Sequence, residues 1–359
     1  MDIMAGSDVV SRRLQDIFRL TPTLLIGSGF SCAYDLPHMG ALGDHLITTL
    51  GSKLVTHEPK DLWTSALSDI RANLEKGLNA IPIGAAGRDE IIRLLREETA
   101  SLIIQRTTEA EARILSSDNP ETHAPARLLR RLYEGAPQNA PCISVITTNY
   151  DTLLELFCDL ASLPLDTGFE GFRRRRVREH TLFQTHYTRS IATDRKRGST
   201  YEHRPKPTVR LIKPHGSITW LTTEAGPIEV VNDQSTAARA IVVPGPSKYE
   251  DALINTLFDR VRGEMNVTLS QTQALVCIGF GFNDEHLQGI IRGRLDAGMP
   301  AVIITRDLTD AAQAIVNKHP HVLAFCRDGD GAVCYYDGNV CRFSAPIWQL
   351  DPFLRQFLE

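Results

Sequence analysis

The sequence TLLIGSGFS occupies residues 23–31 and joins a short apolar run to a glycine-rich turn. Such a run, bounded by Gly27 and Gly29, is typical of a buried strand that ends in a tight turn. Glycines there let the backbone approach a pyrophosphate, and the N-terminus of a following helix supplies amide donors. The hydride-transfer fingerprint G-x-G-x-x-G has glycine where this chain has Cys32, which argues against an ordinary dehydrogenase.

Strand-like runs recur after residue 140 and alternate with helical stretches near the C-terminus. Strand and helix in alternation predict a parallel sheet covered on both faces. We therefore predict an α/β fold with a Rossmann-like sheet and a smaller helical insertion. The expected strands are 142–146, 209–212, 274–278, 301–304 and 322–325, and the expected helices between the last three are 284–295 and 309–317.

The remaining segments are placed around this sheet. The first 20 residues predict a helix, and residues 333–343 predict a hairpin that turns at Asp337-Gly338-Asn339. The expected organisation is a single domain over 1–359, with its divisions as follows. The Rossmann-like core takes about 20–50, 140–160 and 207–330, the helical insertion about 51–135, a basic insertion about 160–206, and the C-terminal hairpin and helix 331–359.

Composition describes an ordinary globular protein. The 359 residues are 42% hydrophobic and 23% charged, with a net charge of −4. No apolar run is long enough for a membrane span and the N-terminus has no signal-peptide core, so we expect a cytoplasmic protein without a membrane partner. No two of the seven cysteines form C-x-x-C, so we expect no zinc, and those in apolar runs are expected to be buried thiols.

Residues 173–213 are much more basic than the rest of the chain. They contain 13 Lys/Arg and 3 Asp/Glu, so this segment carries +10 and the rest of the chain −14. The segment is either a solvated, mobile insertion or a contact for an acidic partner or a phosphate backbone. We expect it to lie outside the sheet core, and replacement of 173–176 by serine to weaken assembly without unfolding the protein.

Three more polar stretches follow predicted strands. Thr148-Asn149-Tyr150-Asp151 follows the second strand, and its Asn149 can orient a ribose hydroxyl or a water, while Asp151 can either act in the site or cap the next helix. A further stretch at 213–220 contains His215, whose residue type suits a general base near neutral pH. A lone histidine is more often structural, but its place at a strand end before glycine favours function.

The last stretch, Gly279-Phe-Gly281-Phe-Asn-Asp284, follows the strand 274–278. Its glycines again permit close approach to a ligand. Asp284, or the asparagine before it, can cap the following helix.

These four stretches, in this order over residues 20–330, resemble the sirtuin family, specifically its bacterial Sir2-like branch. The resemblance implies that Asn149 and His215 act at the nicotinamide ribose of NAD. It also implies a set of binding residues around the dinucleotide. These are Gly27, Ser28, Gly29, Phe30 and Ser31 at the phosphates, Thr148 and Asp151 beside Asn149, and Gly279, Gly281, Thr305 and Arg306 near the adenosine half.

The departures from sirtuin deacylases are equally informative. The four-cysteine zinc module and the segment that pairs with an acyl-lysine peptide have no counterpart here. The resemblance therefore implies NAD glycohydrolysis by an effector of bacterial anti-phage defence, with NAD as substrate. It further implies a homo-oligomer and a regulatory partner such as a HerA-type ATPase, and leaves direct nucleic-acid binding open. A deacylase or ADP-ribosyltransferase, and a non-catalytic nucleotide-sensing module, are the alternatives.

Overall fold

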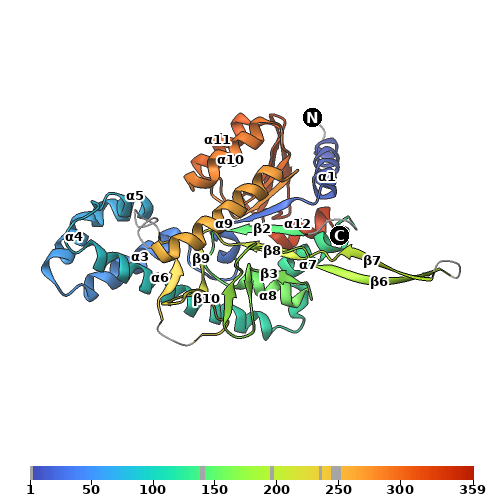
Figure 1. Ribbon diagram of the computed structural model, residues 1–359. Coiled ribbons are helices and arrows are strands. Elements are labelled where there is room, and N and C mark those ends of the chain that lie inside the picture. Colours follow the sequence, from blue (N-terminus) through green and yellow to red (C-terminus); the bar gives the residue numbers. More distant parts are fainter. Residues whose placement is uncertain (1–2, 138–141, 195–197, 234–236, 244–251) are drawn as a thin grey trace.

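A central sheet of nine strands organises the molecule (Figure 1). The computed structural model describes residues 3–137, 142–194, 198–233, 237–243 and 252–359. The strand order is β16-β15-β14-β13-β12-β1-β2-β8-β3, and the seven strands from β14 to β3 run parallel. Their bounds are β1 Thr23–Ile26, β2 Ile143–Thr147, β3 Leu165–Asp166, β8 Val209–Ile212, β12 Leu275–Ile278, β13 Ala301–Ile304, β14 Leu323–Asp328, β15 Gly331–Tyr336 and β16 Asn339–Phe343.

The sheet confirms the predicted fold class. From β1 the chain moves to β2 and β8 on one side, and from β12 to β13 and β14 on the other. This is the doubly wound order in which the direction of winding reverses between β1 and β12. The carboxyl ends of these strands share one edge of the sheet, where ligands of such folds bind. Among the described residues, no helix is long and apolar enough to cross a membrane.

Helices cover both faces of the sheet because successive strand residues point to opposite sides. Leu24 and Ile26 pack in one core with α1 (Ile3–Arg19), α7 (Ala124–Gly135), α8 (Leu153–Leu160) and α12 (Leu350–Phe357). Leu25 packs in the other with α9 (Ala252–Gln271), α10 (Glu285–Asp296) and α11 (Asp310–Lys318). The β15–β16 hairpin turns through Asp337 and Gly338, both at positive φ, as its sequence predicts.

A helical unit with its own apolar core extends from one end of the sheet (Figure 1). It starts earlier than expected and excludes α7, which packs on the sheet instead. Its helices are α3 Met39–Lys53, α4 His57–Ala72, α5 Leu74–Asn79 and α6 Arg88–Leu115.

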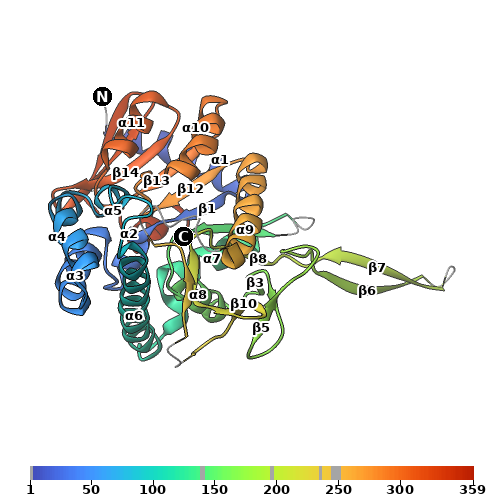
Figure 2. The ribbon, with the colours of Figure 1, turned by 60° about the vertical axis from the view of Figure 1, so that its left-hand side comes forward.

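Much of the described part of the basic segment forms β-strands. A second, five-stranded sheet has the order β11-β9-β10-β5-β4 and includes residues from both sides of the segment. Its strands are β4 Phe169–Glu170, β5 Arg175–Val177, β9 Gly216–Thr223, β10 Gly226–Glu229 and β11 Arg239–Ile241. A hairpin of β6 (Tyr187–Asp194) and β7 (Gly198–Pro205) projects as an arm opposite the helical unit (Figure 2).

The expectation that residues 173–213 lie outside the sheet core is therefore wrong for its two ends. β8 lies within the main sheet, and β5 pairs with β10. Within 160–206, β3 also extends the main sheet. β-Branched and aromatic residues recur at 187–191 and 216–223, and this pattern indicates the strands β6 and β9.

Candidate functional site

Five loops meet where five neighbouring parallel strands end. In sheet order, the strands β13, β12, β1, β2 and β8 are followed by Thr305, Gly279, Gly27, Thr148 and Lys213. The shared edge gathers segments as far apart in the chain as Gly27 and Thr305. The topology therefore places every stretch singled out in the sequence at one edge of the sheet.

The glycines of the two central loops pack against each other. A Cβ on Gly27 would lie 2.4 Å from the carbonyl oxygen of Gly279, and one on Gly279 would lie 2.3 Å from the amide of Phe30. The amides of Gly27 and Gly29 donate to Ile278 and Gly279 at 3.0 Å. These glycines therefore permit contact between the two loops. Their amides already donate to backbone carbonyls, so they are not free to bind a phosphate.

Helix α2 (Ser28–Cys32) follows directly from this contact. Phe30 turns its ring into the sheet core, where it meets Phe157 edge-on at 6.2 Å, and its amide donates to Gly27. Ser28 is half-buried and Gly29 is exposed. Of the predicted phosphate-binding residues, Ser28 thus offers a polar side chain at the surface.

Asn149 joins the loops after β1 and β2. Its Nδ2 donates to the carbonyl oxygen of Gly27 at 3.0 Å and to Oγ of Ser31 at 2.8 Å. Both acceptors face the amide nitrogen, which fixes the orientation of the carboxamide. In the described part of the chain its Oδ1 makes no hydrogen bond, so this oxygen is the atom left for a ligand.

Ser31 connects Asn149 to Asp151 by hydrogen bonds. Its hydroxyl donates to Oδ2 of Asp151 at 2.7 Å, while Oδ1 of Asp151 accepts from the amide of Leu153 at 3.2 Å. Asp151 therefore accepts from the first amide of α8, whose N-cap is Thr152, and also holds Ser31. Thr148, half-buried between these residues and β2, donates its amide to Ile26 at 3.3 Å.

Lys213, which follows β8, binds Asp151 of this network and also Glu155. Its ammonium donates to the carbonyl oxygen of Asp151 at 2.5 Å and to Oε1 of Glu155 at 2.8 Å. Burial raises the pKa of Glu155, and the charge of Lys213 opposes this rise. Lys213 is 2% exposed, so removal of either partner would leave a buried group without its counterpart.

His215 is paired with a carboxylate that the sequence did not assign to it. Its Nε2 lies 2.8 Å from Oδ2 of Asp284, and the two side chains are 20% and 11% exposed. From the sequence, Asp284 was one of two candidates to cap the next helix, and the structure pairs its carboxylate with the histidine. The carboxylate orients the ring so that Nδ1 is left for a reacting group.

Tyr150 ties the Asn149 loop to the His215 loop. Its carbonyl oxygen accepts from the amide of Ile218 at 3.0 Å, and its hydroxyl donates to the carbonyl oxygen of Val242 at 2.6 Å. Val242 in turn donates its amide to His215 at 2.9 Å. Tyr150, to which the sequence analysis gave no role, thus connects the loops of the two predicted catalytic side chains.

The loop after β13 lies at the opposite end of this row of five loops from the loop after β8. Arg306 is exposed, and its positive charge acts on Cys32 at the end of α2, opposing the burial that raises the pKa of that thiol. Thr305 bonds to the backbone of its own loop. Gly281 lies deeper, and its carbonyl oxygen accepts from the Thr309 hydroxyl at 2.5 Å.

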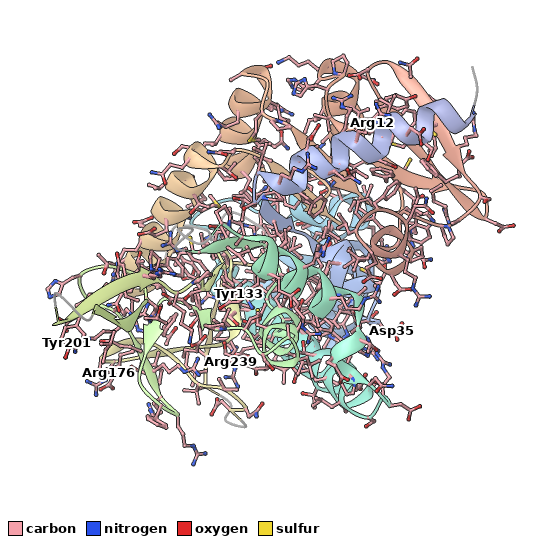
Figure 3. All side chains as sticks on the ribbon, turned by 90° about the vertical axis from the view of Figure 1, so that its right-hand side faces the viewer. Arg12, Asp35, Tyr133, Arg176, Tyr201 and Arg239 are labelled. Carbon is pink, nitrogen blue, oxygen red and sulfur yellow. The ribbon has the colours of Figure 1, made fainter. Side chains whose placement is uncertain are left out.

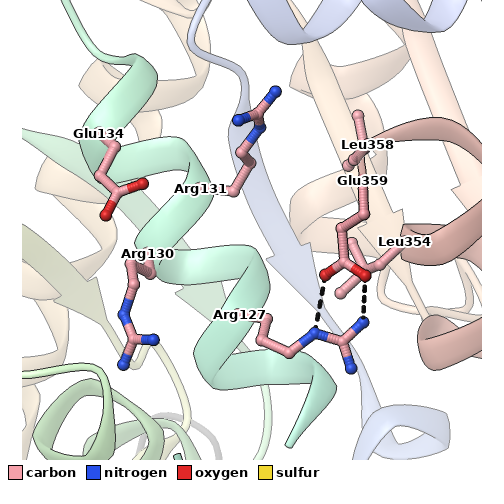
Figure 4. A pocket seen from close by; sticks show the side chains of 7 residues that line it. All are labelled: Arg127, Arg130, Arg131, Glu134, Leu354, Leu358 and Glu359. Atoms are coloured by element: carbon pink, nitrogen blue, oxygen red, sulfur yellow. Dashed lines mark hydrogen bonds and ion pairs between the residues drawn. The ribbon is translucent and has the colours of Figure 1, made fainter. Parts of the chain in front are cut away.

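Two surface clefts lie away from this edge. One separates α7 from α12, where Arg127 forms a double hydrogen bond with Glu359 (Figure 4). The other, of about 410 Å³, is lined by residues that include Tyr34 and His123. None of the predicted site residues lines either cleft. Within the described ranges no group of His, Cys, Asp and Glu side chains is arranged to hold a metal ion.

The arrangement combines a carboxylate-oriented imidazole, an amide oxygen and an exposed arginine along one sheet edge. An imidazole so oriented can accept a proton, and an amide oxygen can hold a hydroxyl group or a water. Such a set suits displacement at a sugar carbon by water. The hydroxyl of Ser31 is held by Asn149 and Asp151, so it is not free to act as a covalent nucleophile.

Comparison with known proteins gives a family match over four of the five site loops. Residues 143–321 match the family model described as SIR2-like domain, which includes every site loop except that of β1. A solved structure concerned with sirtuin substrate affinity shares 10% identity, covering 94% of this chain and 92% of that chain, with a TM-score of 0.41. Another, concerned with the mechanism and regulation of Sir2 enzymes, shares 15% identity over 84% and 90%, with a TM-score of 0.38. No curated protein sequence matches the chain.

Proposed function

Because residues 143–321 carry a SIR2-like domain, we propose that the chain is an NAD glycohydrolase that releases nicotinamide and ADP-ribose. The observation that carries this proposal is the pairing of His215 with Asp284 at the same sheet edge as Asn149. SIR2-like domains use NAD, and this edge is where a doubly wound fold binds a dinucleotide. The polar groups there suit water as the acceptor of the ribosyl group.

The reaction breaks the bond between the nicotinamide nitrogen and C1′ of the ribose. Nicotinamide leaves as a neutral molecule from a cationic ring, so its departure needs little acid catalysis. Water forms the new bond to C1′ and gives up a proton, which Nδ1 of His215 accepts. Asp284 stabilises the imidazolium formed in this step.

Asn149 positions the reacting sugar or the attacking water. Its Nδ2 is used in holding the glycine loop, so Oδ1 accepts a hydrogen bond from a ribose hydroxyl or from the water. The amides of Gly27, Gly29 and Phe30 are engaged, so we assign the phosphates to Ser28 and Arg306. Positioning and electrostatics supply most of the rate enhancement.

We also propose that the activity is regulated. Unrestrained loss of NAD would harm the cell that makes the enzyme, so control by assembly or by a partner is required. The resemblance described above suggests anti-phage defence in bacteria as the setting and a HerA-type ATPase as one such partner.

Nicotinamide release tests the function. We expect turnover by the wild-type chain, and loss of most of it in Asn149→Ala and in His215→Ala. Because both residues act on one transition state, the double variant should be little worse than either single one. His57→Ala, which changes an exposed histidine far from the edge, is the matched control and should keep full turnover.

The assay covers a range of protein concentrations, with NAD affinity measured alongside. A wild-type chain that binds NAD but releases no nicotinamide under any of these conditions would support the sensing module instead. Full turnover by His215→Ala would contradict the assignment of His215 to the active site.

A further inference from the structure

The exposed aromatic rings of this protein gather in its basic segment. Phe172, Tyr187 and Tyr201 are 96%, 60% and 57% exposed, and in the described part of the chain no other phenylalanine, tyrosine or tryptophan is exposed. Phe172 directly precedes residues 173–213, which contain the two tyrosines and carry a net charge of +10. Rings and unbalanced positive charge on one stretch of surface indicate a ligand that offers both flat rings and negative charge.

The first ring lies in the loop between β4 and β5. Arg173, Arg174 and Arg176 follow Phe172 and are exposed. None of these three arginines forms an ion pair with another residue that the structure describes. We call Phe172 and these arginines the tip. It presents an aromatic ring beside three positive charges that the described part of the chain does not neutralise.

The strands that carry the tip are held by ion pairs of their own. Arg175 binds Glu229, which is 4% exposed, at 3.1 Å, and Arg178 binds Asp166, which is 2% exposed, at 2.6 Å. Glu170, the carboxylate nearest to the tip in sequence, lies 3.7 Å from Arg178. These acids therefore serve the arginines that hold the fold. The tip is a fixed surface that loses little conformational freedom when a ligand binds.

The β6–β7 arm carries the two tyrosines on one of its faces. Ile191 pairs with Tyr201 and Arg189 with His203, and residues that are paired or two apart on such a ribbon point to the same side. Tyr187 lies on this side too, and all five residues are exposed. The guanidinium carbon of Arg189 lies 3.5 Å from the centroid of the Tyr201 ring. A guanidinium stacked in this way offers a flat, charged outer side, which suits both a base and a phosphate.

The arm and the tip face solvent on the same side of the molecule. Figure 2 shows β5 and the base of the arm on one side of the body, and the labelled Arg176 and Tyr201 lie at the same margin of Figure 3. The arm is a separate two-stranded sheet, and a hairpin of this kind is marginally stable without a partner. A ligand that contacts the arm therefore stabilises it.

We propose that the tip and the arm bind a single-stranded nucleic acid. Its phosphates pair with the arginines, and its bases stack on Phe172 and on the two tyrosines. Stacking requires bases whose faces are free, which a single strand offers and an intact duplex does not. The charge of −14 outside residues 173–213 repels a polyanion elsewhere and so directs it to this segment. The proposal does not depend on the reaction catalysed.

Fluorescence anisotropy of a labelled oligonucleotide of about 20 nucleotides, longer than the ~4–16 that one small binding domain covers, tests the stacking. The full wild-type chain should bind it. Phe172→Ser and Phe172→Leu should each bind roughly 5–150-fold more weakly, the effect of losing one stacked base. Phe172→Trp should bind like the wild type, because tryptophan keeps a flat ring. The slope of log affinity against log salt should stay the same in all three variants, since no charge is changed.

The salt dependence tests the arginines. Arg173→Ser, Arg174→Ser and Arg176→Ser together should reduce this slope by about 2, because each phosphate contact on a single strand contributes roughly 0.7. The loss of slope separates the arginines from the ring, whose removal weakens binding equally at every salt concentration.

The matched control combines Lys60→Ser, Arg71→Ser and Lys76→Ser, which remove the same charge from exposed positions on the helical unit and should keep the wild-type slope. All variants should melt at the wild-type temperature, since the changed side chains are exposed. No binding by the wild-type chain, wild-type affinity in Phe172→Leu, or an equal loss of slope in the control overturns the proposal. Equal or tighter binding of a duplex, or of an abasic strand of the same length, also overturns it, because neither presents free base faces.

Discussion

Replacement of Asn149 by alanine should weaken the fold as well as the reaction. The side chain lies 9% exposed and bridges Gly27 and Ser31 through its two amide hydrogens. Ser31 keeps its bond to Asp151 in the variant, whereas the Gly27 carbonyl loses the bond from the side chain. The cost is therefore set mainly by the broken link between the loops after β1 and β2.

The size of this effect follows from the bonds removed. Each of the two hydrogen bonds contributes about 1 kcal/mol net, and the Gly27 carbonyl keeps the bond from the Phe30 amide, so no buried acceptor is left without a donor. The free energy of unfolding should thus fall by roughly 1–3 kcal/mol in Asn149→Ala. NAD affinity should fall too, because the loop that carries Ser28 loses its bond to Asn149.

Urea unfolding followed by circular dichroism measures the stability change. Thr148→Ala is the matched control, since this neighbouring side chain is half-buried and should cost less than about 1 kcal/mol. Equal midpoints for Asn149→Ala and the wild type, with equal slopes, would show that the amide does not hold the glycine loop.

Three further changes probe the same edge. Asp284→Asn should lower nicotinamide release by about 10–100-fold with little change in NAD affinity, because a charged hydrogen bond to His215 is lost; unchanged turnover would make the pair structural. Gly279→Ala should cost roughly 2–5 kcal/mol in thermal unfolding, since a Cβ at φ 58° would meet the facing backbone, while Gly289→Ala, with open space around it, should not destabilise. Burial raises the pKa of Cys32, so its alkylation should keep accelerating above pH 9 and slow when NAD is bound; fast labelling at pH 7 would contradict this.

The fold class was readable from the sequence because its strands are buried on both faces. Continuous apolar runs such as 274–278 and 301–304 fall on β12 and β13. Such runs carry their own evidence of strand, since both faces of a covered parallel sheet need apolar side chains. The second sheet escaped prediction because four of its strands, β4, β5, β10 and β11, have only two to four residues and each includes a charged one.

The candidate site was readable as a set of loops but not as a set of contacts. Glycine and polar residues after strands mark the ligand edge of a parallel sheet. The pairing of His215 with Asp284 joins two loops about 70 residues apart, and no local pattern encodes that register. For the same reason, the glycines were interpreted as facing a ligand, whereas their missing Cβ atoms make room for one another.

The position of β1 between β2 and β12 has a consequence for synthesis of the protein. The first strand is made early, but its partner β12 begins at Leu275, after about three quarters of the chain. Until that strand leaves the ribosome, the loop at Gly27 has nothing to pack against on that side, and His215 has no carboxylate. A nascent or truncated chain therefore cannot assemble the edge, and any activity that depends on it begins only when the sheet is nearly whole.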